Sequence, residues 1–592
     1  MYDISAVHEL LASGQIQQAL DAACDALKLD SENAELCNIA GICASMLGDA
    51  VQAERYWERA VALNPLASQS WFNLGLSHAA SGRDDRALEC YRQAIAADPG
   101  NAAAHSNLGL VLEKQRHRDE AEQCHRQAAL LDKGTVGIRF NLANFLSASD
   151  RDEDLEEAKS IFIDVIKIEP THFGAWNNLG TLLFETGYTS AARTAYSAAV
   201  THHPNEVKAH VNLGNVLLYM DDLPAAEEQF NIALDLQPDL APAHQGLASL
   251  LQRRGNGDQA KRHIHKGFGT QPVSTLAYRG RGEPSQLVIL ASALEGNIPW
   301  RLLIDSRVFR ATIIAVEYFD RHLPPHQLIF NAIGDADLCH EGLKIANRLV
   351  ESAQAPLINH PDAVLKTGRL ANSERLASLP GVIAPRMALI SRKDVPSGQI
   401  LQMLAQKGFT FPLLFRAPGF HGGNHFVCIE DASSSAYEEL PGEQLLAIEF
   451  LDSRPEDSLF RKYRVMSING SLFPIHMAIS TQWKVHYFSS DMDEYAQYRA
   501  EEEAFLNNFS AFIGPNATAA LENISRALDL DYCGIDFGID RNGNVLLYEA
   551  NATMVINPPT HDEQWDYRRP AIEHALGAAK RMFAERAGVP FR

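Results

Sequence analysis

Apolar positions recur along the first half of the chain with a period of about 34 residues, which is typical of stacked helix pairs in a solenoid. The repeated motif is Asn-Leu-Gly or Asn-Leu-Ala, and its leucine is Leu74, Leu108, Leu142, Leu179 or Leu213. These leucines are evenly spaced except for the interval from Leu142 to Leu179, which is longer. That interval contains the acidic stretch SASDRDEDLEEA, which we expect to be an insertion between helices. Three units close on a proline (Pro99, Pro204 and Pro238), which stops the second of two helices.

Small and aromatic residues stand at fixed places in these units. Close helix contact is expected at Gly75, Gly109, Gly180 and Gly214, and the space between helices is expected to be filled by Trp57, Tyr91, Tyr196 and Phe230. The pattern consists of Trp or a substitute, then Leu-Gly, Ala, an aromatic residue, Ala and a closing Pro. It resembles the tetratricopeptide repeat over about residues 1–268. Six units align, and the first and last are atypical, as caps should be. The resemblance implies an all-α superhelix of about seven to eight repeats.

Five asparagines occupy the same position in successive units. They are Asn73, Asn107, Asn141, Asn178 and Asn212. A solenoid of this kind offers a concave binding surface, and each side-chain amide presents one acceptor and two donors to an extended peptide backbone. Some tetratricopeptide proteins hold peptides with such a ladder, so the resemblance implies a peptide or protein partner. The alternative is that Asn is simply frequent at this position.

The hydrophobic pattern changes after a segment rich in Gly, Pro and Ser, GTQPVSTLAYRGRGEPS at 269–285, which we interpret as a linker between domains. Beyond it, the short β-branched runs QLVILAS, ATIIAVEYF and QLIFNAIG alternate with helical segments such as HEGLKIANRLVESAQ. This alternation predicts an α/β domain over 286–592.

The stretch GIDFGIDRNGNVLLYEANATM, at 534–554, predicts a β-hairpin with a two-residue turn at Asn542-Gly543. In that register Asp536 lies opposite Glu549, where two carboxylates repel each other. The side chain of Asn551 projects on the same face as that of Glu549. Oxygen ligands gathered in this way suit Mg²⁺, which would convert the repulsion into binding. The alternative is a solvent-exposed face with incidental acids.

Cations and a glycine-rich loop precede this hairpin. The segment FPLLFRAPGFHGGNHFVCIED predicts a strand ending at Arg416, and then a loop whose backbone N–H groups can face phosphates. A second strand ends at Glu449, where the backbone could bind a purine. A third segment begins with Arg461, Lys462 and Arg464, a cluster that suits a phosphate clamp. The alternative for the last segment is a solvated basic turn.

This order of motifs resembles the ATP-grasp superfamily, and is closest to glutathione synthetase and the glutamate ligases that extend peptide or protein ends. The resemblance covers about 286–590 and implies an N-terminal lobe at 286–395 followed by nucleotide-binding lobes at 396–592. It implies that ATP is held by Lys366 (with Arg369 as the second choice), Arg416, His421, Gly422, Gly423, Glu449, Phe450 and Leu451. It assigns Mg²⁺, for which Mn²⁺ can substitute, to Asp536, Glu549 and Asn551, and catalytic charge to Arg464. His476 stands where the family often has a second Arg.

Composition narrows the class of protein. The 592 residues carry a net charge of −22, which weighs against a nucleic-acid binder. The eight cysteines have no C-x-x-C spacing, the N-terminus does not resemble a signal peptide, and no apolar run is long enough to span a membrane. We therefore expect a cytoplasmic protein. Family relatives are often dimers or tetramers, which leaves a homo-oligomer open.

Together these features predict an ATP-dependent carboxylate–amine ligase that releases ADP and phosphate and acts on a polypeptide presented by the repeats. The acyl-phosphate route is implied by the family resemblance. One alternative is an interaction scaffold with a degenerate nucleotide-binding domain. The other is an ATP-grasp kinase, because the same fold supports plain phosphoryl transfer.

Overall fold

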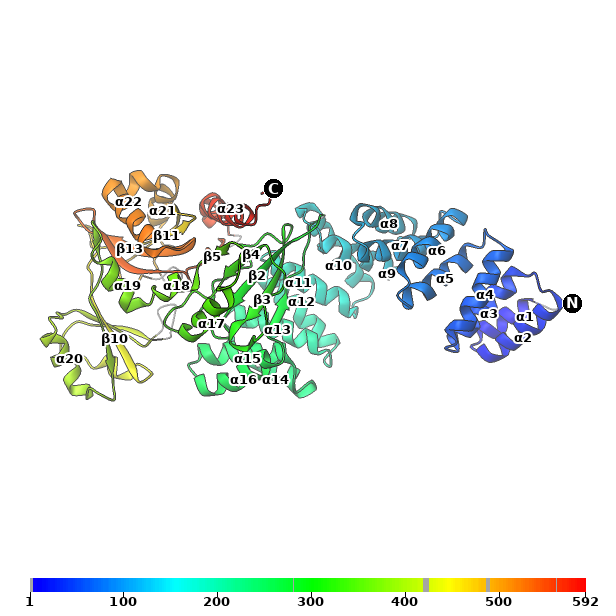
Figure 1. Cartoon of the computed structure of the whole chain (residues 1–592), viewed down its shortest axis with the longest axis horizontal. Coiled ribbons are helices and arrows are strands. Elements are labelled where there is room, and N and C mark those ends of the chain that lie inside the picture. The colour runs from blue at the N-terminus through cyan, green and yellow to red at the C-terminus, as the bar shows by residue number, and fades with distance from the viewer. Residues whose placement is uncertain (1–3, 281, 419–424, 486–489, 560–561, 592) are drawn as a thin grey trace. The chain divides into compact units, whose positions relative to one another are not determined.

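The computed structural model describes residues 4–280, 282–418, 425–485, 490–559 and 562–591. The first half of the chain is all-helical (Figure 1). Its helices are α1 (Ile4–Ala12), α2 (Ile16–Leu29), α3 (Ala34–Met46), α4 (Ala50–Leu63), α5 (Ser68–Ala80), α6 (Asp84–Ala97), α7 (Ala102–Lys114), α8 (Arg118–Leu131), α9 (Val136–Ser147), α10 (Asp152–Ile168), α11 (Phe173–Glu185), α12 (Thr189–His202), α13 (Val207–Tyr219), α14 (Leu223–Leu236), α15 (Ala241–Arg253) and α16 (Gly257–Gly269). The predicted solenoid of helix pairs is confirmed. The acidic stretch extends the start of α10 instead of forming a separate loop.

The expected packing of rings on glycines holds the helix pairs together. A Cβ on Gly75 would lie 2.6 Å from the ring of Tyr91, and one on Gly214 would lie 2.7 Å from the ring of Phe230. The equivalent ring over Gly109 belongs to His125, which the sequence pattern did not single out. An aromatic or imidazole ring therefore lies directly on bare backbone in successive units.

The chain divides into two compact units, Met1–Ile232 and Ala233–Arg592. The second unit contains the last helical hairpin, α15 with α16, as well as the α/β region. Part of the predicted linker is structured, because β1 (Val273–Thr275) pairs antiparallel with β3 (Phe309–Ala315). Edge pairing uses backbone groups and needs no apolar period, so the sequence pattern did not reveal this strand.

The described residues of the α/β region form three sheets, and the predicted strands and helix are found there. The first sheet has the order β1-β3-β2-β4-β5, in which β2 (Ser285–Ala291), β3, β4 (Leu328–Asn331) and β5 (Leu357–Ile358) are parallel. The second is antiparallel, β7-β10-β8-β9, formed by β7 (Met387–Ser391), β8 (Leu413–Arg416), β9 (Phe426–Ile429) and β10 (Gln444–Glu449). The third has the order β12-β11-β13-β14-β6, formed by β6 (Val382–Ile383), β11 (Phe460–Ile468), β12 (Ser471–Ser480), β13 (Tyr532–Ile539) and β14 (Val545–Asn551).

Strand pairing differs from the predicted lobes at one point. Both β6 and β7 lie within the predicted lobe 286–395, yet they pair with β14 and β10 of the other two sheets. The remaining helices are α17 (His340–Val350), α18 (Pro361–Leu365), α19 (Arg369–Leu376), α20 (Ser397–Gln406), α21 (Ala496–Asn507), α22 (Phe509–Leu528) and α23 (Arg569–Arg586). Along the described part of the chain, no helix combines the length and apolar character needed to cross a membrane.

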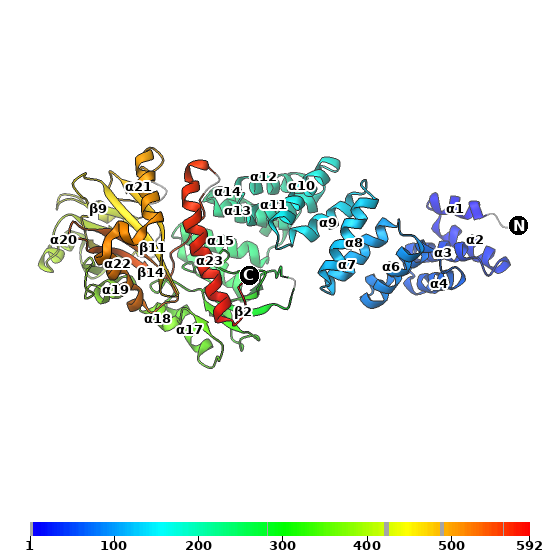
Figure 2. The ribbon, with the colours of Figure 1, turned by 90° about the horizontal axis from the view of Figure 1, so that it is seen from above.

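The first and third sheets share one hydrophobic core, and the second sheet has its own. Helix α23, red in Figure 2, contributes to the shared core: Phe583 lies 5.0 Å from Phe330 of β4 between ring centroids, and the helix also packs on β11 and β12. The C-terminal helix thus connects the parallel sheet to the sheet that carries the predicted hairpin.

The hairpin of β13 and β14 is confirmed, but its turn is not the predicted one. The carboxylate of Asp540 accepts hydrogen bonds from the backbone N–H groups of Asn542 (2.9 Å) and Asn544 (2.8 Å), and Gly543 adopts φ 78°. These bonds make a longer turn, so Ile539 pairs with Val545. A β-bulge beyond Asp536 restores the predicted register, and Asp536 does lie opposite Glu549. The side chain of Asp540 therefore decided the turn.

Candidate functional site

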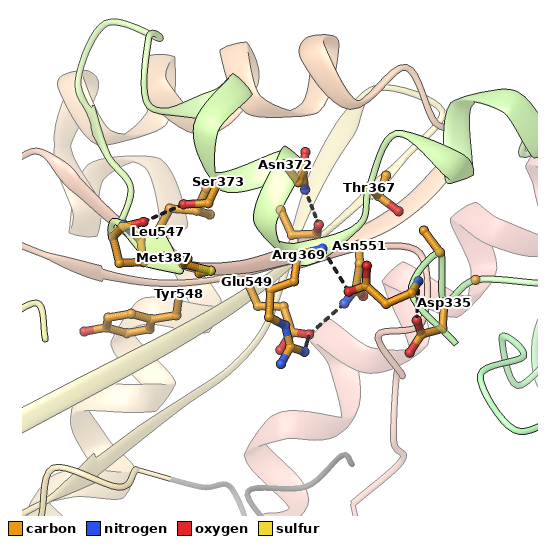
Figure 3. A pocket seen from close by; sticks show the side chains of 15 residues that line it. Asp335, Thr367, Arg369, Asn372, Ser373, Met387, Leu547, Tyr548, Glu549 and Asn551 are labelled. Atoms are coloured by element: carbon orange, nitrogen blue, oxygen red, sulfur yellow. Dashed lines mark hydrogen bonds and ion pairs between the residues drawn. The ribbon is translucent and has the colours of Figure 1, made fainter. Parts of the chain in front are cut away.

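A cleft opens where β14, the start of α19 and the loop after β4 meet (Figure 3). Its polar lining includes Asp335, Asp337, Thr367, Arg369, Asn372, Tyr548, Glu549 and Asn551. In Figure 3, Arg369, Glu549 and Asn551 gather in the middle of the cleft, with Asp335 to one side and Tyr548 to the other. The cleft thus collects charged side chains from segments that are distant in the sequence.

Each of the two facing carboxylates has its own cations, which resolves the predicted repulsion. Arg464 donates to both oxygens of Asp536, at 2.6 Å from Nε and 2.8 Å from Nη2, and Lys462 Nζ lies 2.7 Å from Oδ2. Strand pairing places Arg464 directly across from Asp536. Burial by itself would raise the pKa of Asp536, but the charges of Arg464 and Lys462 outweigh it and hold the pKa far below its ordinary range.

Glu549 is partnered from the other side of the cleft. Arg369 Nη2 donates to its Oε1, and Asn551 Nδ2 donates to the same oxygen at 2.8 Å. The Arg369 backbone N–H in turn donates to Asp337 at 3.0 Å. Burial opposes ionisation of Glu549, yet the charges of Arg369 and Arg416 lower its pKa overall. The carboxylate is therefore ionised at neutral pH.

Arg416 lies near this cluster at the end of β8. Burial, and then the positive charge of Arg369, lower the pKa of Arg416 to about 10, while Glu549 and Asp335 act in the opposite direction. Its guanidinium lies 5.8 Å from the ring centroid of Phe426. Together with Arg369, Lys462 and Arg464, it completes a set of four cations around the two facing carboxylates.

The other residues predicted to hold ATP that the structure describes do not line the cleft, and their nucleotide-binding role stays a prediction. The side chain of Lys366 is exposed and is not among the described residues that line the cleft, whereas Arg369, the second choice, contacts Glu549. His421, Gly422 and Gly423 lie outside the described residues. The carboxylate of Glu449 binds Arg386 at 3.0 Å, Phe450 meets the Phe460 ring edge-on, and Leu451 is half-buried.

His476 does not supply the expected cation. It lies opposite Arg464 on β12, and its side chain is buried. Burial, and next the charge of Arg464, lower the pKa of His476 well below its ordinary value, so the imidazole is neutral at neutral pH. His476 therefore lies next to Arg464 on the neighbouring strand, and burial keeps it neutral.

Sequence reasoning missed the acids and amide on the far side of the cleft. Asp335 and Asp337 follow β4, at the carboxyl edge of the parallel sheet, where ligands commonly bind in open α/β sheets. Asn372 donates from Nδ2 to the backbone oxygen of Ala550 at 2.6 Å, one helical turn beyond Arg369. The stretch GDAD, two residues beyond the buried strand β4, was the available signal.

The five predicted ladder asparagines bind the protein's own groups. Four donate to the preceding helix pair: Asn73 to Asn38, Asn141 to Ser106, Asn178 to Asn144, and Asn212 to Asn177, over 2.8–3.2 Å. Asn107 donates to the backbone oxygen of Ala103 in its own helix at 2.9 Å. The amides therefore connect successive repeats, and the peptide-binding role stays a prediction.

Comparisons with known proteins bear on the helical half. The family model described as tetratricopeptide repeat matches residues 47–102, 85–133 and 177–241. Similar solved structures include YrrB, described as a tetratricopeptide protein with an unusual peptide-binding site (21% identity, 32% of this chain and 95% of that one, TM-score 0.28). Another is Pseudomonas aeruginosa pilF (18% identity, 35% and 92%, TM-score 0.32). No curated protein matches. The helical half of the chain thus contains tetratricopeptide repeats in the matched ranges.

Proposed function

We propose that the protein is an ATP-dependent carboxylate–amine ligase whose substrate is a peptide or protein held by the repeats. The observation that carries the proposal is the β13–β14 hairpin, where two carboxylates face each other among Arg369, Arg416, Lys462 and Arg464. A cluster of fixed cations next to ionised oxygen donors suits a nucleotide triphosphate with its metal ion.

Of the three predicted metal ligands, Glu549 offers a carboxylate to a divalent cation, whereas Oδ1 of Asn551 already accepts hydrogen bonds from the backbone N–H (3.0 Å) and Oγ1 (2.9 Å) of Thr553. Glu549 and Asn551 line the cleft, and Mg²⁺ commonly takes one or two protein oxygens and completes its shell with phosphate oxygens and water. Asp536 fits less well, because Arg464 and Lys462 occupy both of its oxygens and its side chain is buried. Within the described ranges, no group of three His, Cys, Asp or Glu side chains is arranged to hold a metal. We therefore assign Asp536 the role of anchoring the two cations.

The cations have distinct roles in this proposal. Glu549 would hold the metal ion, and Arg369 and Arg416 would bind phosphate oxygens. Asp536 holds Arg464 and Lys462 in place, so these two cations can stabilise negative charge without reorganisation. ATP supplies the phosphoryl group that activates a carboxylate for attack by an amine. His476, being neutral, contributes no charge.

Calorimetric titration of Mg²⁺–ATP into the full chain tests this assignment. We expect micromolar binding by the wild-type protein and binding weakened at least about tenfold, or about 1.4 kcal/mol, by Glu549→Gln. The matched control is Glu443→Gln, because Glu443 is an exposed acid paired only with Lys393 at 2.8 Å among the described ion pairs. It should bind as the wild type does.

Two results would contradict the proposal. Absence of binding by the wild-type chain would favour the interaction scaffold, in which the repeats bind a partner and the α/β domain has no nucleotide-binding function. Binding followed by transfer of phosphate to a small acceptor, without stoichiometric release of free phosphate, would favour a kinase. Phosphate release that depends on an added polypeptide is the result expected of the ligase.

A further inference from the structure

The last helical hairpin contacts two loops at the carboxyl edge of the parallel sheet. After β2, the carboxylate of Glu295 accepts a hydrogen bond from Ser249 Oγ, and Arg253 Nε lies 3.7 Å from it; both partners belong to α15. After β3, the ring of Tyr318 stacks on Phe268 of α16, with 6.5 Å between centroids. The hairpin is also continuous with β1, so it is fixed to the sheet at three points.

The residues of α15 that hold Glu295 occupy repeat positions close to those of the predicted peptide-binding asparagines. Ser249 stands exactly one repeat after Asn215 in the chain, and Arg253 stands one repeat after Tyr219. Asn215 lies one helical turn after Asn212 on the same face of α13, and both Asn215 and Tyr219 are exposed. In the last repeat the corresponding positions bind the chain's own carboxylate.

The loop that carries Glu295 also sets the rim of the cleft. The next residue, Gly296, accepts hydrogen bonds at its backbone oxygen from the N–H groups of Gly334 (2.9 Å) and Asp335 (3.0 Å). Gly296 adopts φ 97°, and a Cβ there would lie 2.7 Å from Cβ of Asp335. The loop after β2 and the loop after β4 therefore pack so closely that a side chain at position 296 would collide with Asp335.

Hydrogen bonds continue from this rim to the middle of the cleft. Asp335 accepts from the backbone N–H of Asp337 at 2.9 Å, and Asp337 accepts from the backbone N–H of Arg369 at 3.0 Å. Arg369 then reaches Glu549. Every member of the series from Ser249 to Glu549 lies in the same compact unit of the chain.

We propose that Glu295 is a positioning residue through which the last tetratricopeptide repeat holds the cleft in shape. In that repeat Ser249 and Arg253 are occupied by Glu295, so we place the partner polypeptide on the earlier repeats. The last helical hairpin is thus built into the α/β unit, and it orients Arg369 through the rim. These contacts do not depend on the proposed function. The proposed function is used only to name Mg²⁺–ATP as the ligand of the cleft.

Amide hydrogen exchange of the full chain without ligand tests the anchor. In Ser249→Ala and Glu295→Leu, we expect the amides of Gly334 and Asp335 to exchange at least about tenfold faster, because the carbonyl that accepts them loses its support. Glu295→Gln keeps an oxygen that can accept from Ser249, so the amides of Gly334 and Asp335 should exchange as slowly as in the wild type. Asn215→Ala, the same repeat position one unit earlier, is the matched control and should exchange at the wild-type rate.

A far-UV melting curve shows whether each variant keeps its overall fold, and Ser249→Ala decides the matter if Glu295→Leu unfolds. Unchanged exchange at Gly334 and Asp335 in a folded Ser249→Ala would overturn the anchor, as would equally fast exchange in Asn215→Ala. The exchange result is independent of the nucleotide. Failure of the wild-type chain to bind Mg²⁺–ATP would remove the proposed ligase activity and leave the anchor intact.

Discussion

Replacing Asp536 by Asn is expected to lower the free energy of unfolding by about 3–5 kcal/mol, because the buried carboxylate is removed while the two cations paired with it stay. The Asp536 side chain is 1% exposed, and its charge is the partner of both Arg464 and Lys462. Asn keeps the shape but leaves these cations near each other without the compensating charge. Urea unfolding followed by tryptophan fluorescence measures the loss.

Asp452→Asn is the control for this experiment. Asp452 pairs with Arg454 at 2.7 Å, but both side chains are more than 40% exposed, so the expected loss is at most about 1 kcal/mol. A loss of unfolding free energy for Asp536→Asn no larger than that for Asp452→Asn would contradict a stabilising role of Asp536 between Arg464 and Lys462.

The Asp536 effect should also have a defined pH dependence. The folded-state pKa of Asp536 is lowered from its ordinary value of 3.8, so its contribution is fully present above that value and is lost only as the pH falls through the folded-state pKa. The stability difference between wild type and variant should therefore be constant between about pH 5 and pH 8.

Phe230→Ala is expected to destabilise the repeats by about 3–5 kcal/mol, which is the usual cost of truncating a fully buried aromatic ring. Phe230 on α14 is completely buried, and its ring lies against the bare backbone of Gly214 on α13. Glycine has no side chain that could move into the vacated space, so the cavity persists. Helical circular dichroism during urea unfolding measures the change.

Leu236→Ala on the same helix is the matched control. Its side chain is 40% exposed, so we expect a loss of no more than about 1 kcal/mol. Similar losses for Phe230→Ala and Leu236→Ala would mean that the ring-on-glycine contact is not what holds the α13–α14 pair together.

Local periodicity accounts for what the sequence predicted well. The regular repeat predicted the helix pairs because each pair must bury the same face against its neighbours. The alternation around Asp540 to Asn544 predicted the hairpin and the opposition of Asp536 and Glu549. The details of the turn were wrong because a side chain, that of Asp540, competed for the backbone N–H groups, and a bulge then compensated for the shift.

The sequence by itself therefore determined the solenoid, the α/β class and the facing carboxylates, all of which follow from patterns that recur locally along the chain. Only the tertiary structure decided their electrostatics. Strand pairing brought Arg464 to Asp536, and the start of α19 brought Arg369 to Glu549 across 180 positions of sequence. Burial made His476 neutral, and edge pairing of β1 joined the last repeat to the sheet. The charges of these side chains and the joining of the last repeat to the sheet depend on residues that are distant in the chain. A local sequence pattern does not predict which distant residues these are.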